Sequence, residues 1–182
     1  MITTVFYDDP IDEEREIPSS IFLAGPTARG VRRTPWRTEA LSLLEGIGFG
    51  GTVLIPEFRD GRFEDLAPRV FGGGASPVAG MRAVSYNVLR WETIGIERST
   101  VVLFWMPFQV REREDPMSLP GFTTRAEVAR EIARRPTRIV LGMPEGAVSG
   151  GHIRFHAHRA GLTISQTLED TVAAAHRKVG GM

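Results

Sequence analysis

Glu127 is the residue whose type and position in this sequence best suit chemistry. It ends the stretch 119–127, Leu-Pro-Gly-Phe-Thr-Thr-Arg-Ala-Glu, which follows an apolar run at 101–105 and is expected to open a helix near Thr124. A carboxylate in the first turn of a helix faces its partly positive N-terminus, which favours the ionised, nucleophilic form. Thr124 and Glu127 also fit a capping box, in which the glutamate only satisfies a backbone donor. The motif alone leaves both interpretations open.

Glu92 is a second carboxylate that could take part in the same chemistry. The helix expected to begin at Ser76-Pro77 keeps its apolar positions at a 3.6-residue spacing: Met81, Val84, Val88, Trp91 and Gly95. Glu92 lies one turn beyond Val88 and beside Trp91, so we expect it near the inward edge of that face. A carboxylate there needs a partner or a function, and pairing with a neighbouring arginine is the structural alternative.

The elements that must position these glutamates alternate along the chain. Strands are expected at 20–24, 52–55, 101–105, 138–142 and 162–164, with helices beginning near 35, 76, 124, 150 and 165. This alternation predicts an α/β fold, a flavodoxin-like or Rossmann-like doubly wound sandwich with a five-stranded, mostly parallel sheet. We expect residues 20–182 to form a single domain, residues 1–19 to be a lead-in with a possible edge strand, and 57–79 to be an irregular lid or substrate loop.

Ligands of such sheets bind beyond the carboxyl ends of the strands. The loops expected at that edge carry Gly25, Pro26 and Thr27 after the first strand and Glu57 after the second. After the third strand come Gly121, Phe122, Thr123 and Thr124, with Glu127 close behind. These residues are the candidate binding site.

Composition narrows the class of partner. The 182 residues hold 22 basic and 22 acidic side chains and no cysteine, so nothing in the net charge calls for nucleic acid, and no disulfide or thiolate site is available. No signal peptide or membrane-spanning run is recognised, which favours a soluble cytoplasmic protein with a small-molecule ligand. No glycine-rich dinucleotide or P-loop signature is recognised either. His152 and His156 share a helical face without a third ligand, so neither a metal nor a cofactor is expected.

Six short motifs, taken in order, resemble those of the nucleoside 2-deoxyribosyltransferase-like family. They are Ile21–Thr27 (Ile-Phe-Leu-Ala-Gly-Pro-Thr), Trp36-Arg37, Leu54–Glu57 (Leu-Ile-Pro-Glu), Trp91-Glu92, Leu103–Trp105 (Leu-Phe-Trp) and Gly121–Glu127. The resemblance covers residues 20 to 142. It implies a flavodoxin-like fold and cleavage of the N-glycosidic bond of a nucleoside or nucleotide, with transfer of the sugar to another base or its release to water. It also implies a homo-oligomer.

The resemblance assigns roles by position. Glu127 matches the family's nucleophile, which forms a covalent glycosyl-enzyme intermediate, and Glu92 matches an acidic position that assists as acid or base. This mechanism is that of a retaining glycosidase, in which the two carboxyl groups lie about 5 to 5.5 Å apart. The turn at Gly25 would approach the nucleoside through its backbone. Phe122, Trp36 or Trp105 could stack on the base, although each also suits the core.

The chain also departs from the family pattern. Ala129 stands where the family usually has glycine, and no match is found for the asparagine and second aspartate that hold the sugar 5′-hydroxyl. Arg29, with Arg32 and Arg33, could instead hold a 5′-phosphate or form a solvated basic loop. A catalytically silent nucleotide-binding or sensor domain, and a purely structural partner protein, therefore stay open beside the enzyme.

Overall fold

The computed structural model describes residues 1–26, 36–60, 63–71, 75–107, 121–147 and 150–182, and its centre is a parallel sheet. The strands are β1 (Thr3–Val5), β2 (Ile17–Ala24), β3 (Thr52–Leu54), β4 (Ser99–Trp105), β5 (Ile139–Gly142) and β6 (Ile164–Ser165). They lie in the order β1-β3-β2-β4-β5-β6, and every neighbouring pair is parallel. The predicted α/β class is confirmed, with six strands instead of five because β1 pairs with β3 at one edge.

The strand order places a topological switch point between β2 and β4. Without β1, the remaining strands follow the flavodoxin-like order 2-1-3-4-5. The chain leaves β2 toward β3 on one side and later returns to β4 on the other side. The carboxyl ends of β2 and β4 therefore flank the crevice where such sheets bind their ligands.

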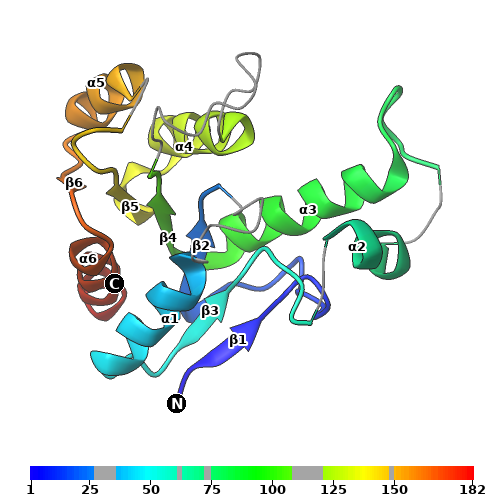
Figure 1. Cartoon of the computed structure of the whole chain (residues 1–182), viewed down its shortest axis with the longest axis horizontal. Coiled ribbons are helices and arrows are strands. Elements are labelled where there is room, and N and C mark those ends of the chain that lie inside the picture. Colours follow the sequence, from blue (N-terminus) through cyan, green and yellow to red (C-terminus); the bar gives the residue numbers. More distant parts are fainter. Residues whose placement is uncertain (27–35, 61–62, 72–74, 108–120, 148–149) are drawn as a thin grey trace.

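Helices cover both faces of the sheet (Figure 1). They are α1 (Trp36–Gly46), α2 (Phe63–Phe71), α3 (Ala83–Arg98), α4 (Phe122–Arg134), α5 (Gly151–Arg159) and α6 (Leu168–Gly180), with a 3-10 turn η2 (Pro136–Arg138) before β5. The alternation of side chains along β2 divides the core: Ile21 and Leu23 join the cluster under α1 and α6, whereas Phe22 and Ala24 join the cluster under α3, α4 and α5.

The prediction for the segment between β3 and β4 is wrong in two respects. The segment 57–79, expected to be irregular, contains α2, where Ala67 is buried although Pro68 lies inside the helix. Helix α3 begins at Ala83 and not near Ser76-Pro77, because Gly80 adopts a positive φ of 78° that interrupts a helix. Tertiary packing stabilises α2 although Pro68 is of a type that usually breaks a helix.

No helix in the described ranges combines the length and the apolar character needed to cross a membrane.

Candidate active site

Glu127 lies in the second turn of α4, not in the first as expected. The helix begins at Phe122, and its N-cap is Gly121 in the left-handed conformation (φ 64°), with no side-chain hydrogen bond at the cap. The capping-box interpretation of Thr124 and Glu127 is therefore wrong. A glycine supplies the positive φ that starts the helix, and Thr124 is buried in its first turn at 3% exposure.

The environment of Glu127 disfavours its charged form. Burial, and after it the neighbouring negative charge of Glu92, raise the pKa of this half-buried carboxyl to about 7. The charges of Arg130 and Arg37 act in the opposite direction. The expectation that the helix N-terminus keeps this carboxylate ionised is wrong, because desolvation and a like charge outweigh a helix dipole one turn away.

Glu92 approaches Glu127 from a different helix. It lies on α3 one turn before Gly95, where an added Cβ would come within 2.6 Å of the Phe22 ring, so the glycine lets α3 pack closely on β2. Burial raises the pKa of Glu92, while a hydrogen bond from Tyr7 and the charge of Arg37 lower it. Glu92 and Glu127, predicted to act together, lie close enough for the charge of Glu92 to act on Glu127.

Tyr7 belongs to the site and was not predicted from the sequence. Its hydroxyl donates a short hydrogen bond to Oε1 of Glu92, and its backbone N–H donates to the Glu57 carbonyl at 3.0 Å. The ring packs against Trp91 and Phe58, with centroids 5.0 Å and 5.1 Å away. Burial and the Glu92 charge raise the pKa of Tyr7 well above its ordinary value. The only sequence signal was its place at the end of an alternating N-terminal run.

Arg37 joins the ends of two strands at the same edge of the sheet. Its side chain is 2% exposed and makes three hydrogen bonds: Nε to the Leu23 carbonyl (3.1 Å), Nη2 to the Gly25 carbonyl (2.6 Å) and Nη1 to Oε1 of Glu57 (2.5 Å). At Gly25, an added Cβ would lie 2.5 Å from the Trp105 carbonyl oxygen. The observed contacts of Gly25 and Glu57 are thus with protein groups, and their predicted contacts with a ligand stay predictions.

Those of the other predicted binding residues that the structure describes follow the ends of β2 and β4. The Pro26 carbonyl accepts a hydrogen bond from Nε1 of Trp36 at 3.0 Å. Gly121 and Thr123 lie at the start of α4, where Thr123 is exposed. Thr27 and the arginine cluster of Arg29, Arg32 and Arg33 lie outside the described residues.

The two tryptophans expected to stack on a base do not present open rings. Trp36 and Trp105 are core residues, 7% and 8% exposed, on the α1 and α6 side of the sheet. Little ring surface is therefore available to a ligand. The side chain of Phe122 lies outside the described part of the chain.

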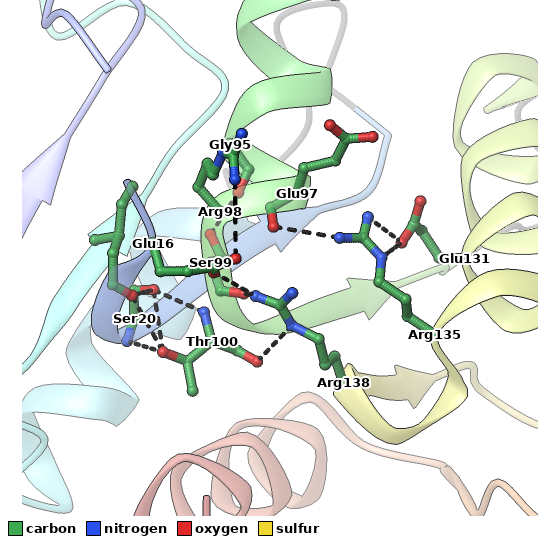
Figure 2. Close-up of polar contacts among 11 residues, drawn as sticks. Glu16, Ser20, Gly95, Glu97, Arg98, Ser99, Thr100, Glu131, Arg135 and Arg138 are labelled. Atoms are coloured by element: carbon green, nitrogen blue, oxygen red, sulfur yellow. Dashed lines mark hydrogen bonds and ion pairs between the residues drawn. The ribbon is translucent and has the colours of Figure 1, made fainter. Parts of the chain in front are cut away.

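A network around Glu131 holds the two glutamate-bearing helices together. The Glu131 carboxylate is 2% exposed and accepts hydrogen bonds from Nε of Arg130 (3.0 Å) and from Nε and Nη2 of Arg135 (3.0 and 2.8 Å). Arg135 also donates through Nη1 to the backbone carbonyl of Glu97 at 3.2 Å. Figure 2 shows Arg135 between Glu131 on α4 and Glu97 on α3. The network therefore links α3 and α4 about one helical turn beyond Glu92 and Glu127 along each helix.

Two further features of the sequence concern metal and dinucleotide sites. The rings of His152 and His156 stand on the surface of α5 with their Nε2 atoms 3.3 Å apart, and the described residues hold no group of three or more His, Cys, Asp or Glu that could bind a metal. Residues 46–51, Gly-Ile-Gly-Phe-Gly-Gly, do match the spacing GxGxxG, contrary to the sequence interpretation. They join the end of α1 to β3, so the strand-then-helix context of a dinucleotide site is missing.

The candidate site thus combines Glu127, Glu92 and Tyr7 from three elements with the buried cation Arg37, at the carboxyl edge of the sheet. Known proteins add no assignment: no protein-family model and no curated protein matches this chain.

Proposed function

We propose that this chain cleaves the N-glycosidic bond of a nucleoside or nucleoside 5′-monophosphate through a covalent glycosyl–Glu127 intermediate. The observation that supports this most is the convergence of Glu92 and Glu127, with a pKa near 7 at Glu127, beside the topological switch point. Paired carboxyl groups with raised pKa values, one able to hold a proton while the other attacks, are what a retaining glycosidase needs near neutral pH.

With a pKa of about 7, Glu127 is ionised in roughly half of the molecules at neutral pH, and in the first step this ionised form attacks the anomeric carbon of the sugar. An oxygen–carbon bond forms, the carbon–nitrogen bond breaks, and its electron pair leaves on the base nitrogen. Glu92 supplies the proton that this nitrogen takes up. Burial raises the pKa of Glu92 and so favours its protonated form, and the Tyr7 hydroxyl bonded to Oε1 fixes the orientation of the carboxyl group.

In the second step, the ester between the sugar and Glu127 is broken. A water molecule attacks the anomeric carbon, Glu92 accepts the water's proton, and the Glu127 carboxylate leaves. When a second base attacks through its nitrogen in place of water, the same step completes transfer of the sugar. Hydrolysis and transfer therefore share the intermediate and differ only in the acceptor.

The activity is tested with a panel of ribonucleosides, deoxyribonucleosides and their 5′-monophosphates, each with and without an acceptor base, by following the free base chromatographically. We expect base release that Glu127→Ala abolishes, and an acid-quenched protein whose mass increases by one sugar at Glu127. Glu45→Ala, which removes an exposed carboxylate from α1, is the control and keeps the activity.

The outcomes separate the candidate functions. Base release in buffer alone identifies hydrolysis, and release only with an added base identifies transfer. Binding of a nucleoside without release, unchanged in Glu127→Gln, contradicts the proposal and identifies a silent binding domain.

The proposal includes a homo-oligomer. Helix α2 exposes Phe63 and Val70, each at 44%, which lie two helical turns apart on one face. Light scattering of the purified chain tests this, and a monomeric mass at micromolar concentration contradicts it.

A further inference from the structure

Arg37 is a buried cation whose ion pair, within the described residues, is with Glu57. It is the second residue of α1, it is 2% exposed, and its guanidinium is held by two carbonyl groups and one carboxylate at the ends of β2 and β3. A buried guanidinium needs such partners, because an unpaired charge in the interior is strongly unfavourable. The three acceptors allow the chain to keep a positive charge at this depth.

The charge of Arg37 reaches three groups from three different elements. It lowers the pKa of Glu127 on α4, of Glu92 on α3 and of Tyr7 after β1. Arg37 acts on all three groups, whereas Arg130 acts on Glu127. Glu57, whose Oε1 lies 2.5 Å from Nη1, is the counter-charge that limits this effect.

We propose that Arg37 is the positioning residue of this site: it ties the ends of β2 and β3 together and holds a buried positive charge, paired with Glu57, at the sheet edge where Glu92 and Glu127 converge. The role given to Glu127 rests on the proposed function. The charge effect itself is a property of the ligand-free protein and can be measured without any reaction.

The test is a pH titration of the Glu127 side-chain carboxyl carbon by NMR in protein labelled with ¹³C at glutamate, with the signal assigned by Glu127→Gln. The other groups that act on Glu127 are Glu92 on α3 and Arg130 and Glu131 on α4, and they stay unchanged. Arg37→Gln removes the cation, so we expect the midpoint to rise by roughly half a unit to one unit. Glu57→Gln removes the counter-charge and keeps two carbonyl contacts of Arg37, so we expect the midpoint to fall.

Opposite shifts distinguish the proposal from general structural damage. Arg37→Lys keeps the charge but loses the guanidinium fork, so it leaves the midpoint near that of the native protein and lowers the melting temperature. Glu39→Gln, on the exposed side of α1, is the control and changes neither the midpoint nor the melting temperature. If Arg37→Gln does not fold, the Glu127 midpoints in Glu57→Gln and Arg37→Lys test the proposal. A midpoint that stays constant in Glu57→Gln, or rises, overturns the proposal whether or not the protein releases a base.

Discussion

Glu127 and Glu131 lie one turn apart on α4, and their surroundings differ completely. Glu131 is the more deeply buried residue, at 1% exposure, yet two arginines donate three hydrogen bonds to it. Glu127 is less buried, and within the described part of the chain its carboxylate has no hydrogen-bond partner. Its nearest charged neighbours include a second carboxylate, Glu92.

The difference shows that depth of burial alone does not identify a reactive carboxylate. A buried charge with matched donors contributes to the packing of helices, whereas a carboxyl group beside a like charge holds its proton near neutral pH. Glu131 therefore serves the arrangement of α3 and α4, and Glu127 is the carboxylate to which we assign the proposed chemistry. Substitutions at the two positions should have opposite consequences.

The largest expected effect is on activity at Glu127. Glu127→Gln removes the nucleophile and relieves repulsion with Glu92, so base release should fall by about a thousandfold or more while the melting temperature is kept or raised. Initial rates and thermal unfolding of the same preparation measure both. An active variant, or one that loses both activity and stability, would remove the distinction between the two glutamates.

Glu131→Gln should give the reverse pattern in stability. It leaves Arg130 and Arg135 without their counter-charge, so the free energy of unfolding should fall by about 2 to 3 kcal/mol, since both arginines are partly solvated. Urea unfolding measures this change, and Glu45→Gln should shift the free energy by less than about 0.5 kcal/mol. A neutral result at Glu131 would show that the network does not stabilise the fold.

Stability should fall with rising pH because of Glu127. Its folded pKa of about 7 lies above the ordinary value of 4.5, so the folded state holds a proton that the unfolded state has released between these pH values. The free energy of unfolding should therefore fall across this interval, by roughly 2 kcal/mol after allowance for solvent screening. Urea unfolding at several pH values, compared between the native protein and Glu127→Gln, isolates this contribution. An equal slope in the two proteins would contradict the raised pKa.

Tyr7→Phe should have the smallest effect on stability. It removes the donor to Glu92, so the free energy of unfolding should fall by about 1 kcal/mol, and the pKa of Glu92 should rise because the bonded hydroxyl had favoured the charged form. Tyr86→Phe is the matched control, because no hydrogen bond joins the Tyr86 hydroxyl to another described residue. NMR titration of Glu92 in both variants makes the comparison, and equal midpoints would show that Tyr7 does not act on the site.

The fold could be predicted from the sequence because apolar runs such as 101–105 alternate with helical patterns, which limits the topology to a parallel sheet. Glu92 and Glu127 were predicted as site residues from a helix face and from a family resemblance, and the structure brings them together. Their ionisation could not be predicted, because it depends on burial and on charges from other elements. For the same reason Tyr7 was missed and Arg37 was noted only as part of a motif, without a role, since each acquires its role through contacts distant in sequence.

The hydrogen bond between Tyr7 and Glu92 spans 85 positions of the chain. It closes only when β1 has added to the edge of the sheet and α3 has docked on the sheet. Contacts of such sequence separation are slow to form, because chain closure opposes them entropically. During refolding, the helical circular dichroism signal should therefore recover before base release does. The completed site marks the end of folding.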